Sequence, residues 1–252
     1  MSFANKPWLL QQGAKPLPMI FVLNGINERI CLFDLTGEGR ITVEYYNYGI
    51  STTKLTDTYD VEPEKNLSIE VEVSGVTEIT ISGIITSITP GSNIVGLKAQ
   101  KITSLEYIGG SNLSSVYVRG CPELRNIDLS GTSNTNDVAL ITNENLLSLT
   151  FFSISTLKIA NCLNLRDVRF SGIESPAPII TISGKTSVDL IRYAGDDYPQ
   201  EDEMKNGIIA LITSSTAETG TVDCTGLSPA ATEEFKAELQ ALVEGYGWTI
   251  TF

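Results

Sequence analysis

Apolar and polar positions repeat along the middle of the chain with a step of about 20 residues. An apolar-x-apolar-x-x-Cys-x-x-Leu-x-x-apolar-x-apolar template occupies residues 116–129 and returns at residues 157–170. Further copies begin at residues 97 and 138, so the four starts are 19, 22 and 19 residues apart. The repeat-core positions of the two clearest copies are Val116, Val118, Cys121, Leu124, Ile127, Leu129, Leu157, Ile159, Cys162, Leu165, Val168 and Phe170.

A step this short excludes a helix-pair repeat and predicts one strand plus a return segment per turn of a solenoid. Within the apolar-x-apolar core, flanking side chains should point inward and the residue between them outward. The Cys or Asn slot should hydrogen-bond backbone groups where the chain leaves the strand. Cys121 and Cys162 lie two turns apart, about 10 Å, which is too far for a disulfide. The residues expected to face outward include Tyr117, Arg119, Asn126, Asp128, Lys158, Asp167 and Arg169.

The C-terminal part, residues 196–252, predicts further αβ turns and a cap. Apolar residues recur at i, i+4, i+7 and i+8 from Met204, which indicates an amphipathic helix. A strand over 221–224 precedes a second helix with Ser228 as N-cap, Pro229 at its first position and Gly245 at its end. A last strand over 248–252 completes a parallel sheet with right-handed crossovers.

The N-terminal part, residues 19–75, differs in kind and predicts a small β-sandwich-like antiparallel domain. Strand patterns cover 30–33, 41–45 and 67–73, and Gly37-Glu38-Gly39 is a hairpin signal between the first two. Together with the preceding features, this predicts a mixed β/α solenoid with a parallel sheet over 76–195 and a helical C-terminal cap.

Residues 1–18 form a proline-containing segment that predicts an extended arm. Two interpretations stay open: the arm folds onto its own β domain and buries Trp8, or it docks into a neighbouring subunit with Trp8 as its anchor. The candidate partner-binding residues are Trp8, Leu9, Leu10, Tyr46 and Tyr48. Because alternate residues of a strand point inward, only part of the aromatic set at 45–48 can be available.

The repeat template resembles leucine-rich-repeat proteins of the BspA-like type, which occur in gut Bacteroidetes and in phages that infect them. The resemblance covers roughly residues 79–252. It implies a scaffold used for recognition or for structure, and it says little about any particular ligand.

The amino-acid composition argues against nucleic-acid binding, against catalysis that uses histidine, and against metal sites. The formal net charge of −13 opposes nucleic-acid backbones and anionic membranes as partners. Histidine is absent, which removes the commonest general base and metal ligand. Cys31, Cys121, Cys162 and Cys224 are too widely spaced for a zinc motif or a disulfide framework. We therefore expect no catalytic residues, no cofactor and no metal.

Two motifs invite a functional interpretation. Gly184-Lys185-Thr186 lacks the upstream glycine of a phosphate-binding loop, because position 179 is Ile, and so it predicts a turn. The acidic residues at 196–203 have no calcium-loop spacing and are typical of a connection that leads into a helix N-terminus. Whether this loop binds a cation stays open.

Three functions are compatible with these features. The first is a virion component of a phage such as a crAss-like phage, as a head or tail decoration, fibre or adaptor. It would be made in the host cytoplasm without a signal peptide and would contact other virion proteins, further copies of itself as a homo-oligomer, or a host glycan or protein. The second is a bacterial cell-surface adhesin or glycan- or protein-binding module. The third, a polysaccharide-active enzyme on a β-solenoid, ranks last because the outward carboxylates form no pairs at a fixed step. Membrane insertion is not expected, since no apolar run approaches about 20 residues.

Overall fold

The computed structural model describes most of the chain beyond the predicted arm. The arm, residues 1–18, lies outside the described residues. The described ranges are 19–23, 29–46, 54–63, 65–72, 78–90, 94–102, 105–109, 113, 115–131, 135–152, 154–171, 178–195, 201–227 and 232–252.

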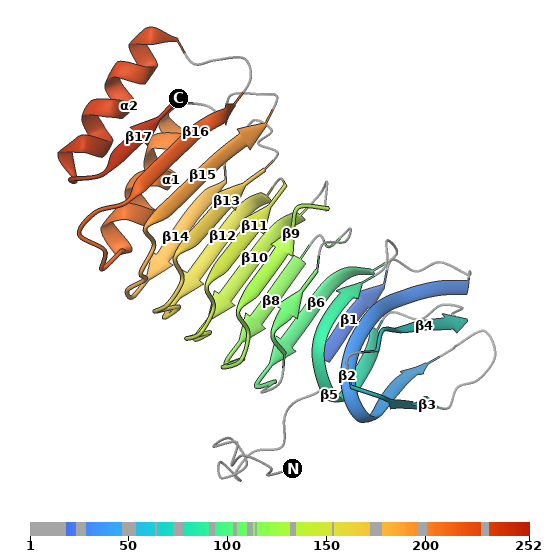
Figure 1. Ribbon diagram of the computed structural model, residues 1–252. Coiled ribbons are helices and arrows are strands. Elements are labelled where there is room, and N and C mark those ends of the chain that lie inside the picture. The colour runs from blue at the N-terminus through green and yellow to red at the C-terminus, as the bar shows by residue number, and fades with distance from the viewer. Residues whose placement is uncertain are drawn as a thin grey trace.

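The middle of the chain is a mostly parallel β-solenoid in which each full turn supplies two strands (Figure 1). We name the two stacks of strands the first ladder and the second ladder. The first ladder contains β6 (Ile94–Gln100), β8 (Ser115–Arg119), β10 (Thr135–Ile141), β12 (Ile154–Ala160) and β14 (Ile179–Ser183). The second ladder contains β7 (Tyr107–Ile108), β9 (Asn126–Leu129), β11 (Ser148–Phe151), β13 (Asp167–Phe170), β15 (Leu190–Gly195), β16 (Thr221–Leu227) and β17 (Thr249–Thr251).

The prediction of one strand per turn was wrong, because the return segment is itself a strand. The end of each template copy alternates apolar and polar residues, and this alternation forms β9 and β13 of the second ladder. The predicted stacking of the copies is present, since Val138 pairs with Val116 on one side and with Leu157 on the other. The steps of 19 and 22 residues are thus one full turn of the chain around the core.

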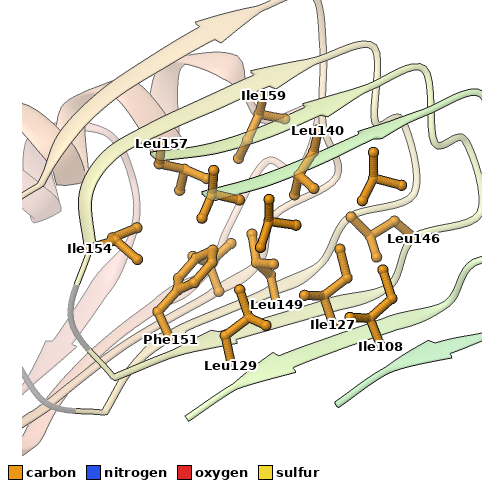
Figure 2. Packing of buried hydrophobic residues seen from close by; sticks show 14 of the residues in the cluster. Ile108, Ile127, Leu129, Leu140, Leu146, Leu149, Phe151, Ile154, Leu157 and Ile159 are labelled. Atoms are coloured by element: carbon orange, nitrogen blue, oxygen red, sulfur yellow. The ribbon is translucent and has the colours of Figure 1, made fainter. Parts of the chain in front are cut away.

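The hydrophobic core fills the space between the two ladders. In Figure 2, Leu140, Leu157 and Ile159 of the first ladder point toward the layer that carries Ile127 and Leu149 of the second ladder. The residues between the inward positions are more exposed, as the pattern eBiBe of β8 shows. All the repeat-core positions are buried: Val116, Val118, Cys121, Leu124, Ile127, Leu129, Leu157, Ile159, Cys162, Leu165, Val168 and Phe170.

A column of left-handed residues marks the corner where each turn leaves the first ladder. Lys101, Gly120, Thr142, Asn161 and Gly184 have φ values of 54°, 62°, 55°, 53° and 92°. The backbone N–H groups of the first four donate to carbonyls of the following turn at 2.7–3.0 Å. The corner is therefore a fixed backbone shape that non-glycine residues adopt at a conformational cost.

Thr142 is the most strained of these corner residues, because it is β-branched. We expect Thr142→Gly to raise the free energy of unfolding by about 0.5–1 kcal/mol, since relief of the left-handed strain exceeds the added freedom of the unfolded chain. The reverse change at the equivalent corner, Gly120→Thr, should lower it by about 1–2 kcal/mol. Urea denaturation measures both, and a stabilising Gly120→Thr would contradict the strain. An added Cβ at Gly120 has room, with its nearest neighbour 4.0 Å away, so backbone conformation alone is tested.

The Cys or Asn residue that follows a corner forms hydrogen bonds with backbone groups of the preceding turn. The side-chain oxygen of Asn143 accepts from the N–H of Cys121 at 3.1 Å, and its side-chain nitrogen donates to the carbonyl of Val118 at 3.1 Å. The Cys162 thiol lies 3.8 Å from the carbonyl of Leu140, the position equivalent to Val118. Cys121 and Cys162 are free and buried, in agreement with the prediction that they form no disulfide. Burial raises the pKa of both thiols, to about 11 for Cys121, which makes them unreactive at neutral pH.

Beyond β14, helices replace strands of the first ladder while the second ladder continues (Figure 1). Helix α1 (Glu201–Ser214) connects β15 to β16 and contacts β14, and α2 (Glu233–Gly245) connects β16 to β17. The last residue of α2 is Gly245, as predicted, whereas the predicted N-terminal cap was wrong. Its N-cap is Thr232, whose side chain accepts from the N–H of Phe235 at 3.2 Å, and the left-handed glycine after its end is Gly247 with φ 77°. Ser228 and Pro229 lie outside the described residues.

The N-terminal strands pair antiparallel. They are β1 (Met19–Leu23), β2 (Arg29–Tyr46), β3 (Lys54–Val61), β4 (Leu67–Glu72) and β5 (Glu78–Pro90). The predicted hairpin at 37–39 was wrong: β2 runs through it as one strand with register shifts against β5. Gly37 allows this path because a Cβ there would lie 2.2 Å from the carbonyl oxygen of Ile84.

These antiparallel strands continue into the solenoid without a break in hydrogen bonding. Strand β1 pairs with β6 of the first ladder, and Ser87 and Ile88 of β5 pair parallel with β7 of the second. The first part of β5 belongs to the antiparallel strands, since Ile79 and Ile81 pair with β1. A separate domain over 19–75, like the other predicted boundaries, stays a prediction.

Candidate functional site

The outer face of the second ladder carries charged side chains in register. Its successive strands β9, β11, β13, β15 and β16 place one residue each in a row along the solenoid axis. We name this row the charged column. Its members are Asp128, Thr150, Arg169, Arg192 and Asp223.

Arg169 is held by a carboxylate of its own strand. Its Nε and Nη2 donate to Oδ2 of Asp167 at 2.8 and 2.5 Å. These hydrogen bonds raise the pKa of the Arg169 guanidinium, and the charges of Asp167 and Asp128 act in the same direction. The positive charge of Arg169 is thus largely neutralised by Asp167.

The carboxylate of Asp223 also has hydrogen-bond partners within the protein. Its Oδ1 accepts from the backbone N–H of Thr225 at 3.1 Å and from the Thr225 hydroxyl at 2.7 Å. These bonds lower the pKa of the Asp223 carboxyl, and the nearby charge of Arg192 lowers it further. Asp223 is therefore an anion at neutral pH whose Oδ1 is already occupied.

Arg192 differs from both neighbours in the column. Within the described residues, no carboxylate lies within ion-pair distance of its guanidinium, and its buried Nε has no hydrogen-bond acceptor. On the adjacent strand, the buried Oδ1 of Asp167 has no donor. Buried polar atoms without partners are rare in proteins, so these two atoms set this part of the face apart.

A second candidate is an open groove of about 440 Å³ at the edge where each turn enters the second ladder. Its charges are paired, since Arg166 Nη2 lies 2.6 Å from Asp189 Oδ2, and Arg166 is 65% exposed. An exposed pair of this kind contributes about 0–1 kcal/mol. The groove is lined by Leu147, Asn164, Arg166, Ser187, Asp189, Thr216 and Ala217.

The predicted grouping of the partner-binding residues stays a prediction. Trp8, Leu9, Leu10 and Tyr48 lie outside the described residues, and Tyr46 is the last residue of β2. Tyr45 is the inward member of the tyrosine set: it is buried, and its hydroxyl donates to Asp57 Oδ2 at 3.1 Å.

The two motifs singled out in the sequence occupy structural positions. Gly184 is a solenoid corner, as the turn prediction implies. Residues 201–203 begin α1, whereas Asp196 and Asp197 lie outside the described residues. In the part of the chain that the structure describes, no group of three or more His, Cys, Asp or Glu side chains could hold a metal ion.

Sequence reasoning identified Asp128, Asp167 and Arg169 as outward but missed Arg192 and Asp223. The signal for Arg192 was present, because Val188, Ile191 and Tyr193 match Leu165, Val168 and Phe170 in the template. That alignment puts Arg192 at the position of Arg169. Asp223 lies beyond the template, where α1 interrupts the step, so only the structure shows its place.

No family model, characterised protein or solved structure matches the chain significantly. Neither helix of the described residues has the length and apolar character that a membrane span requires. The evidence on function is therefore the arrangement of the surface itself.

Proposed function

We propose that this chain is a non-enzymatic structural and interaction protein of a phage virion, serving as a head or tail decoration, fibre or adaptor, and that its solenoid is of the leucine-rich-repeat type. The observation that carries this proposal is the continuous second ladder, in which each strand from β7 to β17 bonds to the next. At about 4.8 Å per strand, the ladder spans about 29 Å. Such a stack is rigid because every turn is supported by its neighbours.

A rigid face with side chains in register is suited to presenting a partner-binding surface. Partners in a virion would be other structural proteins or further copies of this chain. The template resemblance supports this context, because leucine-rich-repeat scaffolds serve mainly in recognition and structure.

Mass spectrometry of purified virions from a culture that produces this chain tests the proposal, with the cell-envelope fraction analysed in parallel. We expect the chain at a fixed copy number per virion. Its absence from virions together with enrichment in the envelope would contradict a virion role and support the second candidate.

The second candidate is a bacterial cell-surface adhesin or glycan-binding module. The charged column favours it, because a partly exposed row of arginine, aspartate and hydroxyl side chains can hydrogen-bond the polar groups of a glycan.

A further inference from the structure

The outer face of the first ladder carries basic side chains without ion-pair partners. Lys98 of β6, Arg119 of β8 and Lys158 of β12 are exposed. None of the ion pairs among the described residues includes these three cations. One outward residue on the described strands of this ladder is acidic: Asp137, diagonal to Lys158, which accepts from the Thr156 hydroxyl at 2.5 Å. We name the outer face between Lys98 and Lys158 the basic face.

The centre of the basic face is small and partly apolar. Tyr117 and Ala139 lie between Lys98 and Lys158 in one register row. On the same outer side, Ile179 of β14 is 69% exposed. Helices α1 and α2 lie beyond these strands, at the C-terminal end of the solenoid (Figure 1). A partly apolar centre with a charged rim is typical of a protein-binding surface.

The C-terminal part of the chain carries the opposite charge. Residues 201–252 contain 9 acidic and 2 basic residues, a net charge of −7. Helix α2 turns one side toward the core, so its opposite side faces outward. The outward residues are all exposed, with two alanines in the middle and three glutamates around them: Glu233, Glu234, Ala237, Ala241 and Glu244. We name this surface the acidic helix face.

Two of its glutamates keep their charge available. Glu234 belongs to no ion pair among the described residues, and Glu244 accepts from the neutral side-chain amide of Gln240 at 2.8 Å. Glu233, by contrast, is paired with Lys236 of the same helix. An opposite charge on a partner would therefore act mainly on Glu234 and Glu244.

The charges of the two surfaces have matching spacings. Lys98 and Lys158 are three strands apart in one row, which is about 14 Å. Glu244 follows Glu234 by 10 residues along α2, which is about 15 Å. A helix laid along the solenoid axis can thus place both glutamates opposite both lysines, with its two alanines above the centre of the basic face.

Exposed apolar side chains lie at the matching end of each surface. Tyr246 directly follows α2 and is 43% exposed. When Glu244 lies opposite Lys158 of β12, Tyr246 lies over β14, the next strand, which carries Ile179. Contact between the two side chains would remove exposed apolar area from water, which favours association.

The charge of the predicted arm does not suit the basic face. Residues 1–18 contain Lys6 and Lys15 and no acidic residue, so the arm would add positive charge to three unpaired cations. The acidic helix face has the required sign, spacing and small central side chains. In its own chain α2 connects β16 to β17 at the end of the solenoid, so the helix that reaches the basic face belongs to another copy.

We propose that the acidic helix face of one copy docks on the basic face of a second copy of this chain. The two surfaces differ, so the contact is heterologous, and each copy can bind one neighbour through each surface. Such contacts build a ring or an extended row. The inference rests on the proposed function and deepens it, because it names the chain itself as one partner of the rigid solenoid.

Sedimentation velocity of the full chain over a range of protein concentrations tests the proposal. We expect species larger than the monomer to increase with concentration. Raising the salt from about 0.05 M to about 0.5 M should weaken the association, because exposed charge pairs are screened.

Charge reversal tests the two surfaces separately. The face variant is Lys98→Glu with Lys158→Glu, and the helix variant is Glu234→Lys with Glu244→Lys. Each alone should associate at least about a hundredfold more weakly than the wild type, because like charges then meet. An equimolar mixture should associate again, since each reversed surface then meets its opposite charge and each native surface does too.

The matched control is Arg40→Glu with Arg125→Glu. It changes the net charge from −13 to −17, as the face variant does, at exposed residues outside both surfaces. It should associate like the wild type. Thermal unfolding checks every variant, and Lys158→Gln or Glu244→Gln replaces a double variant that fails to fold, with an expected weakening of about tenfold.

A wild-type chain that stays monomeric throughout would overturn the inference. So would full association of either variant alone, which would assign the contact to another segment such as residues 1–18. A mixture that does not associate, or a control weakened as much as the face variant, would also contradict it. A chain at fixed copy number in virions but monomeric in solution would refute this inference and leave the virion proposal intact, so the two failures are distinguishable.

Discussion

Phe170→Ala should lower the free energy of unfolding by about 3–5 kcal/mol, the range for removing a buried aromatic ring. Phe170 is 2% exposed and is the middle of three rings that stack along the second ladder. Its centroid lies 4.8 Å from that of Tyr193, at an interplanar angle of 14°, and 6.0 Å from that of Phe151. The substitution therefore removes two ring contacts and leaves a cavity between adjacent turns. Urea denaturation measures the loss.

Phe170→Leu is the matched control, because it fills most of the volume but loses the ring stacking. We expect it to lower the free energy of unfolding by about 1–2 kcal/mol. A second readout is the Tyr193 phenol, whose pKa is raised by burial. A cavity beside it admits water in Phe170→Ala, so the phenol should ionise at lower pH, which ultraviolet absorbance follows. Equal stability of the alanine and leucine variants, with unchanged ionisation, would show that the ring column contributes nothing beyond volume.

Asn143→Ala should lower the free energy of unfolding by about 2–5 kcal/mol. The change leaves the N–H of Cys121 and the carbonyl of Val118 buried without partners, and each such group costs about 1–3 kcal/mol. Because these groups belong to the turn before Asn143, the substitution should loosen that turn as well. Hydrogen exchange at the Cys121 amide reports this directly.

Two further variants provide comparisons for the effect of Asn143→Ala on the free energy of unfolding. Asn143→Cys introduces the residue that the same slot holds at Cys121 and Cys162, and it restores a donor to Val118 but no acceptor for Cys121. Its effect should be about half that of alanine. Asn145→Ala removes an exposed amide of the same turn, bonded to the Pro122 carbonyl at 2.8 Å, and should change stability by no more than about 0.5 kcal/mol. An Asn143→Ala variant as stable as Asn145→Ala would refute the role of the slot.

The solenoid could be predicted because its apolar pattern is strict where each turn packs against the next. Val116, Val138 and Leu157 stack as the template requires. The second strand of each turn was missed because two alternating apolar residues are too short a signal to distinguish a strand from an irregular return. Stacking with neighbouring turns, which the sequence of one turn does not contain, makes β9 and β13 strands.

Other predictions were wrong or missing for a different physical reason. Gly37 and Gly39 resemble a hairpin signal, but here the glycine permits close packing of β2 on β5. The corner residues Lys101 and Thr142 carry no turn signal, since their left-handed conformation is imposed by the geometry of stacking. On the candidate site, the outward positions follow from alternation, but which arginine lacks a partner depends on side-chain conformations that no pattern encodes.

The corner hydrogen bonds also set the order in which turns can be completed as the chain leaves the ribosome. The N–H of Gly120 donates to the carbonyl of Ile141, and that of Thr142 donates to Ala160. The Asn143 side chain likewise reaches back to the turn that precedes it. The hydrogen bond of each of these corners therefore cannot form until the residues of the following turn have been synthesised. We therefore expect the last turn outside the ribosome to stay incomplete until the residues of the following turn have also emerged.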